Sequence, residues 1–261
     1  MDMTENLRLG KNQWIVLFAL IGINAALAFF TLALGLTEML PGEAAASELP
    51  DVPNWVLGLA NAGLILVAYG ALGAAGVWLG RRAGLPGVYR PGAGWRNWAW
   101  LPLIYGTIVG VLMVAGDRAF AALGDWGGLA HPAFPLSLLA SASAGIGEEV
   151  IFRGFVMGVW AWLLTRFLRG ARGTGIALWI ANGIAALAFA AGHLPAVMLL
   201  YGAQTPLELP PALLLEMLVL NGLVALVAGE RCRRDGLVAA MGVHFWADIV
   251  WHVIWPLVFR L

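Results

Sequence analysis

A small set of acidic, basic and histidine residues lies inside otherwise apolar stretches of the chain. On membrane-insertion scales, a charged side chain costs about 2.5–3.5 kcal/mol near the centre of a spanning helix, so such residues usually face the protein interior and have a function. Imidazole groups exchange protons near neutral pH, and so do carboxyl groups whose pKa is raised by an apolar interior, which suits both to acid–base chemistry. The residues are Glu148, Glu149, Arg153, His193, Glu216, His244, Asp248 and His252.

The stretch 147–154 contains two adjacent glutamates and one arginine. On a helix, Glu149 and Arg153 are four residues apart with the acid on the N-terminal side, which is the favourable order for an ion pair. Glu148 is rotated by about 100° from Glu149 and has no oppositely charged partner in its own helix. We therefore interpret Glu149 as the partner of Arg153 and Glu148 as the candidate general base. The alternative is that both acids serve helix packing or ion pairing.

A histidine and a proline interrupt another apolar stretch. Pro195 follows His193 closely, and a proline there removes a backbone hydrogen bond and frees the carbonyl of Ala191. Distorted helices at membrane depth occur mainly where they line an enclosed or watered cavity. We expect His193 to lie at such a cavity.

The last apolar stretch contains a row of polar residues. Four-residue spacings place His244 and Asp248 on one helix face, with His252 one turn further along. Taken alone, this stripe fits a proton path, a metal site or a structural network. With a rise of 1.5 Å per residue, the candidate residues in the three stretches lie roughly 12 to 24 Å below the outer ends of their spans. These depths are compatible with one cluster.

The composition places the chain in a membrane. Apolar residues make up 61% of the sequence and charged residues only 11%, whereas a soluble domain has about 25% charged residues. Seven stretches approach the length of about 20 residues that a spanning helix needs. We predict an all-α, polytopic transmembrane helix bundle of about seven spans, with eight as the alternative because the fourth stretch is long. The stretches are 14–36, 55–80, 98–116, 135–165, 176–201, 210–229 and 237–259.

Basic residues are concentrated in alternate loops. Short loops rich in lysine and arginine stay on the cytoplasmic side, so the N-terminus is predicted to be cytoplasmic, with a topology typical of a prokaryotic inner membrane. The cytoplasmic set is Arg8, Lys11, Arg81, Arg82, Arg90, Arg96, Arg166, Arg169, Arg172, Arg231, Arg233 and Arg234. The opposite loops are assigned Arg118 and Arg260 together with Glu38, Glu43, Glu48, Asp51, Asp117, Asp125 and Glu208.

Small residues recur at spacings that allow helices to approach closely. Examples are Gly73 with Gly76, and Gly106 with Gly110. Such residues are common at helix interfaces in membranes. They predict a compact bundle.

Three motifs follow one another on separate apolar helices. They are Glu-Glu-x-x-x-Arg at 148–153, Phe-x-x-x-His at 189–193 and His-x-x-x-Asp at 244–248. In this order they resemble the CPBP family, which includes the type II CAAX prenyl proteases and many bacterial Abi-domain proteins. The resemblance covers about residues 135–260. It divides the chain into N-terminal transmembrane helices and loops at 1–134, with about three spans, and a CPBP/Abi-type catalytic transmembrane core at 135–261.

The resemblance implies a role for each matching residue. Glu148 and His193 would activate a water molecule that attacks a peptide carbonyl, and His244 and Asp248 would stabilise the oxyanion. Family members often have asparagine at the position of Asp248, and asparagine donates a hydrogen bond that an ionised aspartate cannot donate. We therefore expect Asp248 either to be protonated or to orient His244.

The family has been described both as metalloproteases and as metal-independent glutamic proteases. Glu148, His193 and His244 could supply the three protein ligands of an open zinc site. The sequence contains no His-Glu-x-x-His motif. Our interpretation favours a mechanism without a cofactor and keeps a divalent metal such as zinc as the alternative.

The resemblance implies an intramembrane endopeptidase that acts on a membrane- or lipid-anchored protein in the bilayer. Prenylated substrates would be unexpected in a bacterial inner membrane, and relatives that process C-terminal sorting anchors keep that substrate class open. One alternative is a non-catalytic membrane partner of the bacteriocin-immunity or signalling-regulator type. Another is a proton-coupled transporter using Glu148, Asp248 and His252. The formal net charge of zero gives no indication of a nucleic-acid partner.

Overall fold

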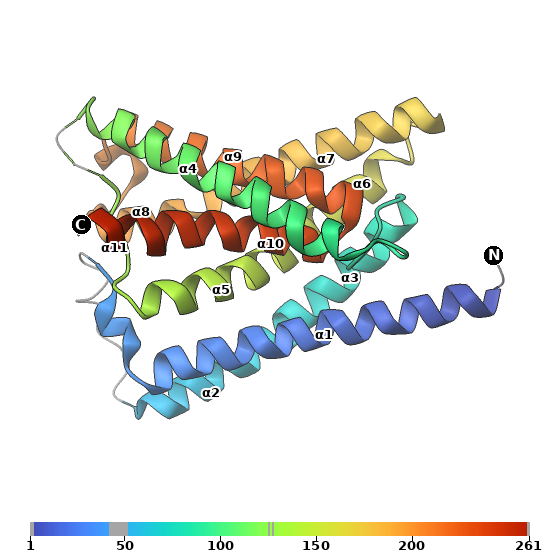
Figure 1. Ribbon diagram of the computed structural model, residues 1–261, viewed down its shortest axis with the longest axis horizontal. Helices are drawn as coiled ribbons and strands as arrows, with labels where there is room; N and C mark the ends of the chain where they lie inside the picture. The colour runs from blue at the N-terminus through green and yellow to red at the C-terminus, as the bar shows by residue number, and fades with distance from the viewer. Residues whose placement is uncertain (1–2, 42–51, 125, 127, 260–261) are drawn as a thin grey trace.

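The computed structural model describes residues 3–41, 52–124, 126 and 128–259, with side chains from residue 10 onward. Every regular element in these residues is a helix, which confirms the predicted all-α class. The start of the first helix and the end of the last lie at opposite ends of the bundle (Figure 1). The predicted loop residues Glu43, Glu48, Asp51, Asp125 and Arg260 fall outside the described residues, as does the side chain of Arg8.

Helical passes run side by side along the long axis of the molecule (Figure 1). Several passes change from α-helix to π-helix without a break. Short 3₁₀ turns, η1 (Leu36–Met39) and η6 (Pro206–Glu208), lie in the connections. In chain order the passes are α1 (Met3–Ala33); α2 (Asn54–Leu64), η3 (Ile65–Tyr69) and α3 (Gly70–Arg82); η4 (Arg96–Trp100) and α4 (Leu101–Ala121); α5 (Leu136–Glu149), η5 (Val150–Val156) and α6 (Met157–Leu164); α7 (Gly170–Gly192) and α8 (Leu194–Leu200); α9 (Pro211–Asp235); and α10 (Leu237–Asp248), η7 (Ile249–Ile254) and α11 (Trp255–Phe259).

Six helical segments in the described part of the chain are long and apolar enough to cross a membrane. This result confirms the polytopic helix bundle. The segment 136–164 is not among the six, although it is continuous and long. It contains Glu148, Glu149 and Arg153 near its middle, so its composition rather than its length sets it apart. The count of seven crossings and the cytoplasmic N-terminus stay predictions.

Several helices extend further than the sequence predicted, and α4 and α9 are two examples. α4 continues to Ala121, so Asp117 is a buried helix residue and its assignment to a loop is wrong. Its carboxylate accepts a hydrogen bond from the backbone of Leu129, which stabilises the extra turn. α9 continues to Asp235, whose side chain pairs with the buried Arg231. In both cases a partner within the protein allows a charged residue to stay in the helix.

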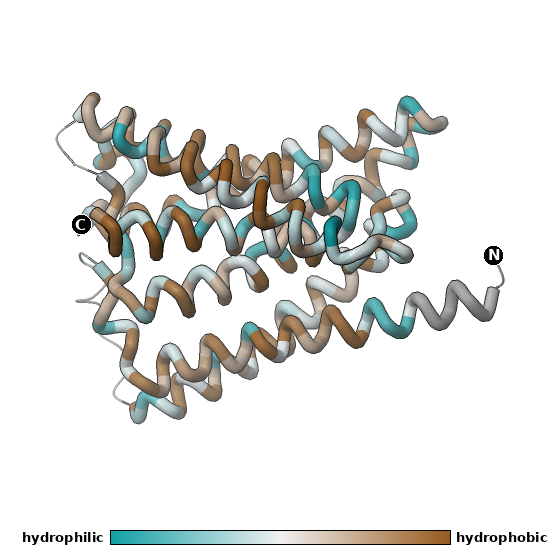
Figure 2. The backbone as a smooth tube through the Cα atoms, in the orientation of Figure 1, coloured by the Kyte–Doolittle hydropathy of each residue, from teal (hydrophilic) through white to brown (hydrophobic). Residues whose placement is uncertain are grey.

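The outer surface of the bundle is apolar. Large side chains such as Val67 and Leu187 are 73% and 70% exposed in the middle of their helices. Figure 2 shows that hydrophobic residues predominate along the helices and that hydrophilic residues are more frequent towards the ends of the bundle. An apolar patch of this extent is not stable in water, so lipid must cover it.

Glycines bring the central helices into contact. α10 packs against α4, α9 and α5. A methyl group added at Gly106 of α4 would lie 2.5 Å from the carbonyl oxygen of Val243 in α10, and Gly110 is similarly restricted. Gly76 of α3 faces the backbone of Gly154 in η5 in the same way. The predicted packing role of these glycines is confirmed, and it holds η5 and α10 inside the bundle.

Candidate active site

The acidic motifs lie where α-helix changes into π-helix. Glu148 and Glu149 end α5, directly before η5. Asp248 ends α10, directly before η7. π-helical turns are rare and occur frequently at functional sites. The sequence patterns did not predict these turns.

Glu149 is completely buried and has two partners. Its Oε1 atom lies 3.0 Å from Nη1 of the buried Arg153 and 2.9 Å from Nδ1 of His244. The guanidinium group of Arg153 also lies over the ring of Phe189, with Cζ 4.4 Å from the ring centroid. The ion pair therefore forms within one helix, as the four-residue spacing indicates. The interpretation of Glu149 as the partner of Arg153 alone is incomplete, because Glu149 also orients His244.

His244 lies between two carboxyl groups. An ionised carboxylate can only accept hydrogen bonds, so Glu149 places a proton on Nδ1 of His244. On the other side of the ring, Nε2 lies 3.5 Å from Oδ2 of Asp248, which is longer than a strong hydrogen bond. Because Glu149 already fixes the ring, Asp248 is not needed for that purpose.

His193 forms the break between α7 and α8. Its backbone N–H donates to the carbonyl of Ala190, and its ring Nδ1 lies 2.9 Å from the carbonyl oxygen of Phe189. A carbonyl oxygen can only accept, so Nδ1 carries the proton and Nε2 is the other, reactive nitrogen. Pro195 interrupts the helix here as expected. The ring of His193 contacts the carbonyl of Phe189, four residues earlier.

Glu148 and His193 face one another across the two helices. Nε2 of His193 lies 3.8 Å from Oε2 of Glu148, too long for a direct hydrogen bond and short enough for both atoms to bind one small molecule. The side chain of Glu148 is 33% exposed, whereas that of Glu149 is completely buried. Of the two adjacent glutamates, only Glu148 can meet a substrate.

One cavity of about 370 Å³ joins these groups, and we call it the front cavity. The ring centroid of Phe189 lies 4.7 Å from that of His193 and 5.3 Å from that of His244, so Phe189 packs between the two histidines. The structure thus brings together residues from three separate passes of the chain. The predicted catalytic residues in the cavity wall are Glu148, His193, His244 and Asp248.

Two further polar residues of α9 extend this description. Asn221 of α9 lines the front cavity, and its Nδ2 donates to the carbonyl of Met217. Asn221 is not among the predicted site residues, although a neutral amide within an apolar span is a usable signal. Glu216 does not line this cavity; it is completely buried and accepts a hydrogen bond from the indole of Trp126.

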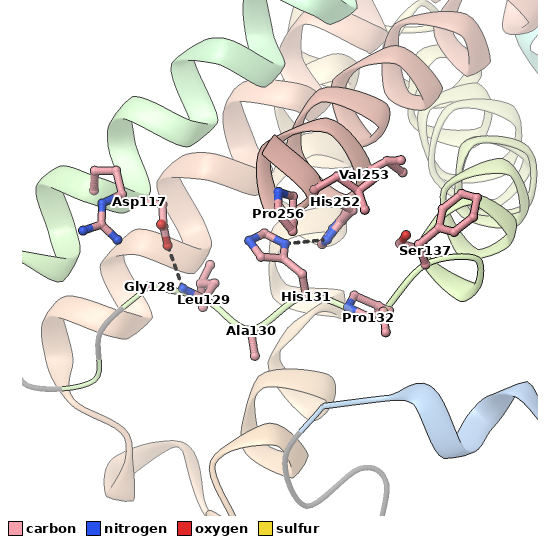
Figure 3. Close-up of a pocket in the computed structure, with 14 residues that line it drawn as sticks. Asp117, Gly128, Leu129, Ala130, His131, Pro132, Ser137, His252, Val253 and Pro256 are labelled. Carbon is pink, nitrogen blue, oxygen red and sulfur yellow. Dashed lines mark hydrogen bonds between the residues drawn. The ribbon is translucent and has the colours of Figure 1, made fainter. Parts of the chain in front are cut away.

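A larger cavity of about 880 Å³, which we call the outer cavity, lies at the end of the bundle (Figure 3). Nδ1 of His131 lies 3.0 Å from Nδ1 of His252, and Asp117 holds the same loop through the backbone of Leu129 (Figure 3). Burial lowers the pKa of His131 to about 4, against a smaller opposing effect of Asp117. His252 also lines the front cavity, so the two cavities adjoin.

The predicted zinc alternative does not fit this arrangement. Within the described residues, no three His, Cys, Asp or Glu side chains converge as metal ligands. Both ring nitrogens of His244 face carboxyl groups other than that of Glu148. Among the residues that the structure describes, Glu148, His193 and His244 therefore do not form a convergent ligand set.

Residues 130–250 match the family model described as "Rce1-like: Type II CAAX prenyl endopeptidase Rce1-like". Comparisons with curated proteins and with solved structures found no match. The matched range contains every residue that the structure brings to the wall of the front cavity from the three motifs. Over these residues, this integral membrane protein is similar to the Rce1-like type II CAAX prenyl endopeptidases, and the match supports its assignment to that family.

Proposed function

We propose that the chain is an intramembrane endopeptidase that hydrolyses a peptide bond in a membrane- or lipid-anchored protein. The observation that carries the proposal is the pairing of Glu148 and His193, 3.8 Å apart, in the wall of the front cavity. The family match supports peptide hydrolysis. The arginine-rich loops support a prokaryotic cytoplasmic membrane as the location.

Glu148 is the proposed base. It takes a proton from a water molecule held between its carboxylate and Nε2 of His193, while the water oxygen bonds to the peptide carbonyl carbon. The C–N bond then breaks and the proton passes to the leaving nitrogen. The carbonyl of Phe189 fixes the ring of His193, so Nε2 needs no reorientation during the reaction.

His244 and Asp248 are the proposed partners of the oxyanion. Glu149 holds Nδ1–H of His244, so a doubly protonated ring donates its Nε2–H to the developing negative charge. An ionised Asp248 would repel that charge, whereas a protonated Asp248 donates a second hydrogen bond. Asp248 is therefore proposed to be protonated when the oxyanion forms.

The test compares the termini of membrane proteins in cells that carry wild-type, Glu148→Gln or Glu216→Gln protein. Glu216 is a matched control because it is another carboxyl group within an apolar helix and it lies outside the front cavity. New termini should depend on Glu148 and should persist in the Glu216 variant. Unchanged cleavage by Glu148→Gln and by His193→Ala would exclude the mechanism and would favour a non-catalytic membrane partner.

Metal dependence needs a separate measurement. Purified protein is equilibrated with a chelator, and both the metal content and the cleavage of the identified substrate are measured. Full activity without bound metal is expected. Loss of activity that returns on adding zinc would contradict the metal-free proposal.

A further inference from the structure

A second cavity reaches Glu148 from the other side of α5. It has a volume of about 440 Å³ and lies between α1, α2 and α5; we call it the back cavity. Thr37 and Leu136 line it at the end of the bundle that carries η1, and Gly147 and Glu148 line it at its inner end. Glu148 thus lies in the walls of both the front and the back cavity.

The two cavities differ in polarity. The front cavity is lined by more residues than the back cavity, but its polar side chains other than histidines and acids are only Ser137, Ser141 and Asn221. The back cavity has twice as many neutral polar side chains in its wall. These are Asn24, Thr31, Thr37, Asn61, Tyr69 and Ser143.

The polar groups of the back cavity lie next to Glu148. Oγ of Ser143 donates to Oδ1 of Asn24 at 2.7 Å. A methyl group added at Gly147 would lie 2.7 Å from Nδ2 of Asn24 and 2.9 Å from the ring of Tyr69. Gly147, which precedes the proposed base Glu148, therefore allows the amide of Asn24 and the phenol ring of Tyr69 to approach this part of α5 closely.

Hydrolysis requires water at Glu148 while the substrate is bound, and the back cavity offers a separate route for that water. A substrate that fills the apolar front cavity expels water from it, although water is a reactant. The back cavity meets the front cavity at Glu148 and at Ala140, Ala144 and Leu40. A route behind α5 can therefore deliver water to Glu148 while the front cavity is occupied.

We propose that the back cavity is a water channel that supplies the hydrolytic water to Glu148, and that Asn24 and Ser143 position that water. The inference rests on the proposed peptidase function. A lipid chain in this cavity would leave several amide and hydroxyl groups without hydrogen bonds, which is costly in an apolar environment. Water satisfies such groups, and the cavity has room for several molecules.

Cysteine labelling tests hydration without measuring proteolysis. The single native cysteine, the buried Cys232, is first replaced by alanine. Asn61→Cys then places a thiol in the back cavity, and Leu64→Cys places one on the 63%-exposed, lipid-facing surface at nearly the same depth. Because thiolates form only where water is present, a charged methanethiosulfonate reagent should label position 61 at least about tenfold faster than position 64. Equal rates would show a dry cavity and overturn the proposal.

Kinetics test the delivery of water. Asn24→Leu with Ser143→Ala removes the polar pair and keeps most of the side-chain volume. The variant should lower kcat by about tenfold and leave KM unchanged, whereas Thr107→Val on α4, outside the cavities described, should change neither. A raised KM with unchanged kcat would mean that the cavity binds substrate, and an unchanged kcat would mean that water arrives elsewhere; either result overturns the proposal. Cleavage retained by Glu148→Gln would refute Glu148 as the base of the proposed peptidase and would leave the labelling result intact.

Discussion

Replacing Glu149 by leucine tests the buried ion pair and the orientation of His244 separately. Arg153 is only 1% exposed, and within the described residues none of its guanidinium nitrogens makes a well-aligned hydrogen bond, so Glu149 at 3.0 Å is its main stabilising contact. Removing one partner of a buried pair costs about 3–5 kcal/mol, whereas replacing both by apolar residues is often close to neutral. Glu149→Leu should therefore lower the free energy of unfolding by about 3–5 kcal/mol. The double variant Glu149→Leu/Arg153→Met should recover most of that loss.

Activity should not return with stability. In the double variant Nδ1 of His244 has lost its acceptor, so the ring is no longer held in position for the oxyanion. The assay combines denaturant-induced unfolding in detergent micelles with cleavage of the identified substrate. A single variant as stable as the wild type would refute the reasoning on the ion pair. A double variant with wild-type kcat would refute the orienting role of Glu149.

Three further variants test other parts of the structure. Asp248→Asn should raise kcat, because an amide donates a hydrogen bond to the oxyanion in any protonation state; a lower kcat would count against the proposed role. The pKa of His131 is lowered from 6.5 to about 4, so the unfolded chain binds a proton that the folded protein excludes, and stability should fall as the pH drops from about 6.5 to about 4. Thermal melts across this range should show a flatter profile for His131→Gln, and an unchanged profile would contradict the assignment. Gly76→Ala should lower the free energy of unfolding by about 1–3 kcal/mol, because the new methyl group meets the backbone of Gly154. Gly63→Ala, which meets nothing within 4 Å, should not destabilise the protein.

Contacts within one helix were predictable from the sequence. The pairs Glu149–Arg153 and His244–Asp248 are each four residues apart, and the helical repeat alone brings them together. The apolar surface and the helical class follow from composition in the same way. Glycine spacing also indicated close packing correctly, because few other residues permit it.

Contacts between helices were not predictable by this reasoning. The bond between Glu149 and His244 joins residues 95 positions apart, and no local pattern shows which helix packs beside which. The assignment of Asp117 to a loop is wrong because hydropathy places a helix end at the first charge, whereas its partner Leu129 allows the helix to continue.

The π-helical segments after Glu149 and Asp248 constrain how this protein can vary in length. A π-helical turn holds more residues than an α-helical turn. Deleting one residue from 150–152 would remove the π-helical turn and would shorten the spacing between Glu149 and Arg153 from four residues to three. The two side chains of the buried ion pair would then be displaced relative to one another. Among relatives, insertions and deletions should therefore occur in the connecting loops, whereas these two helical segments should keep a constant number of residues.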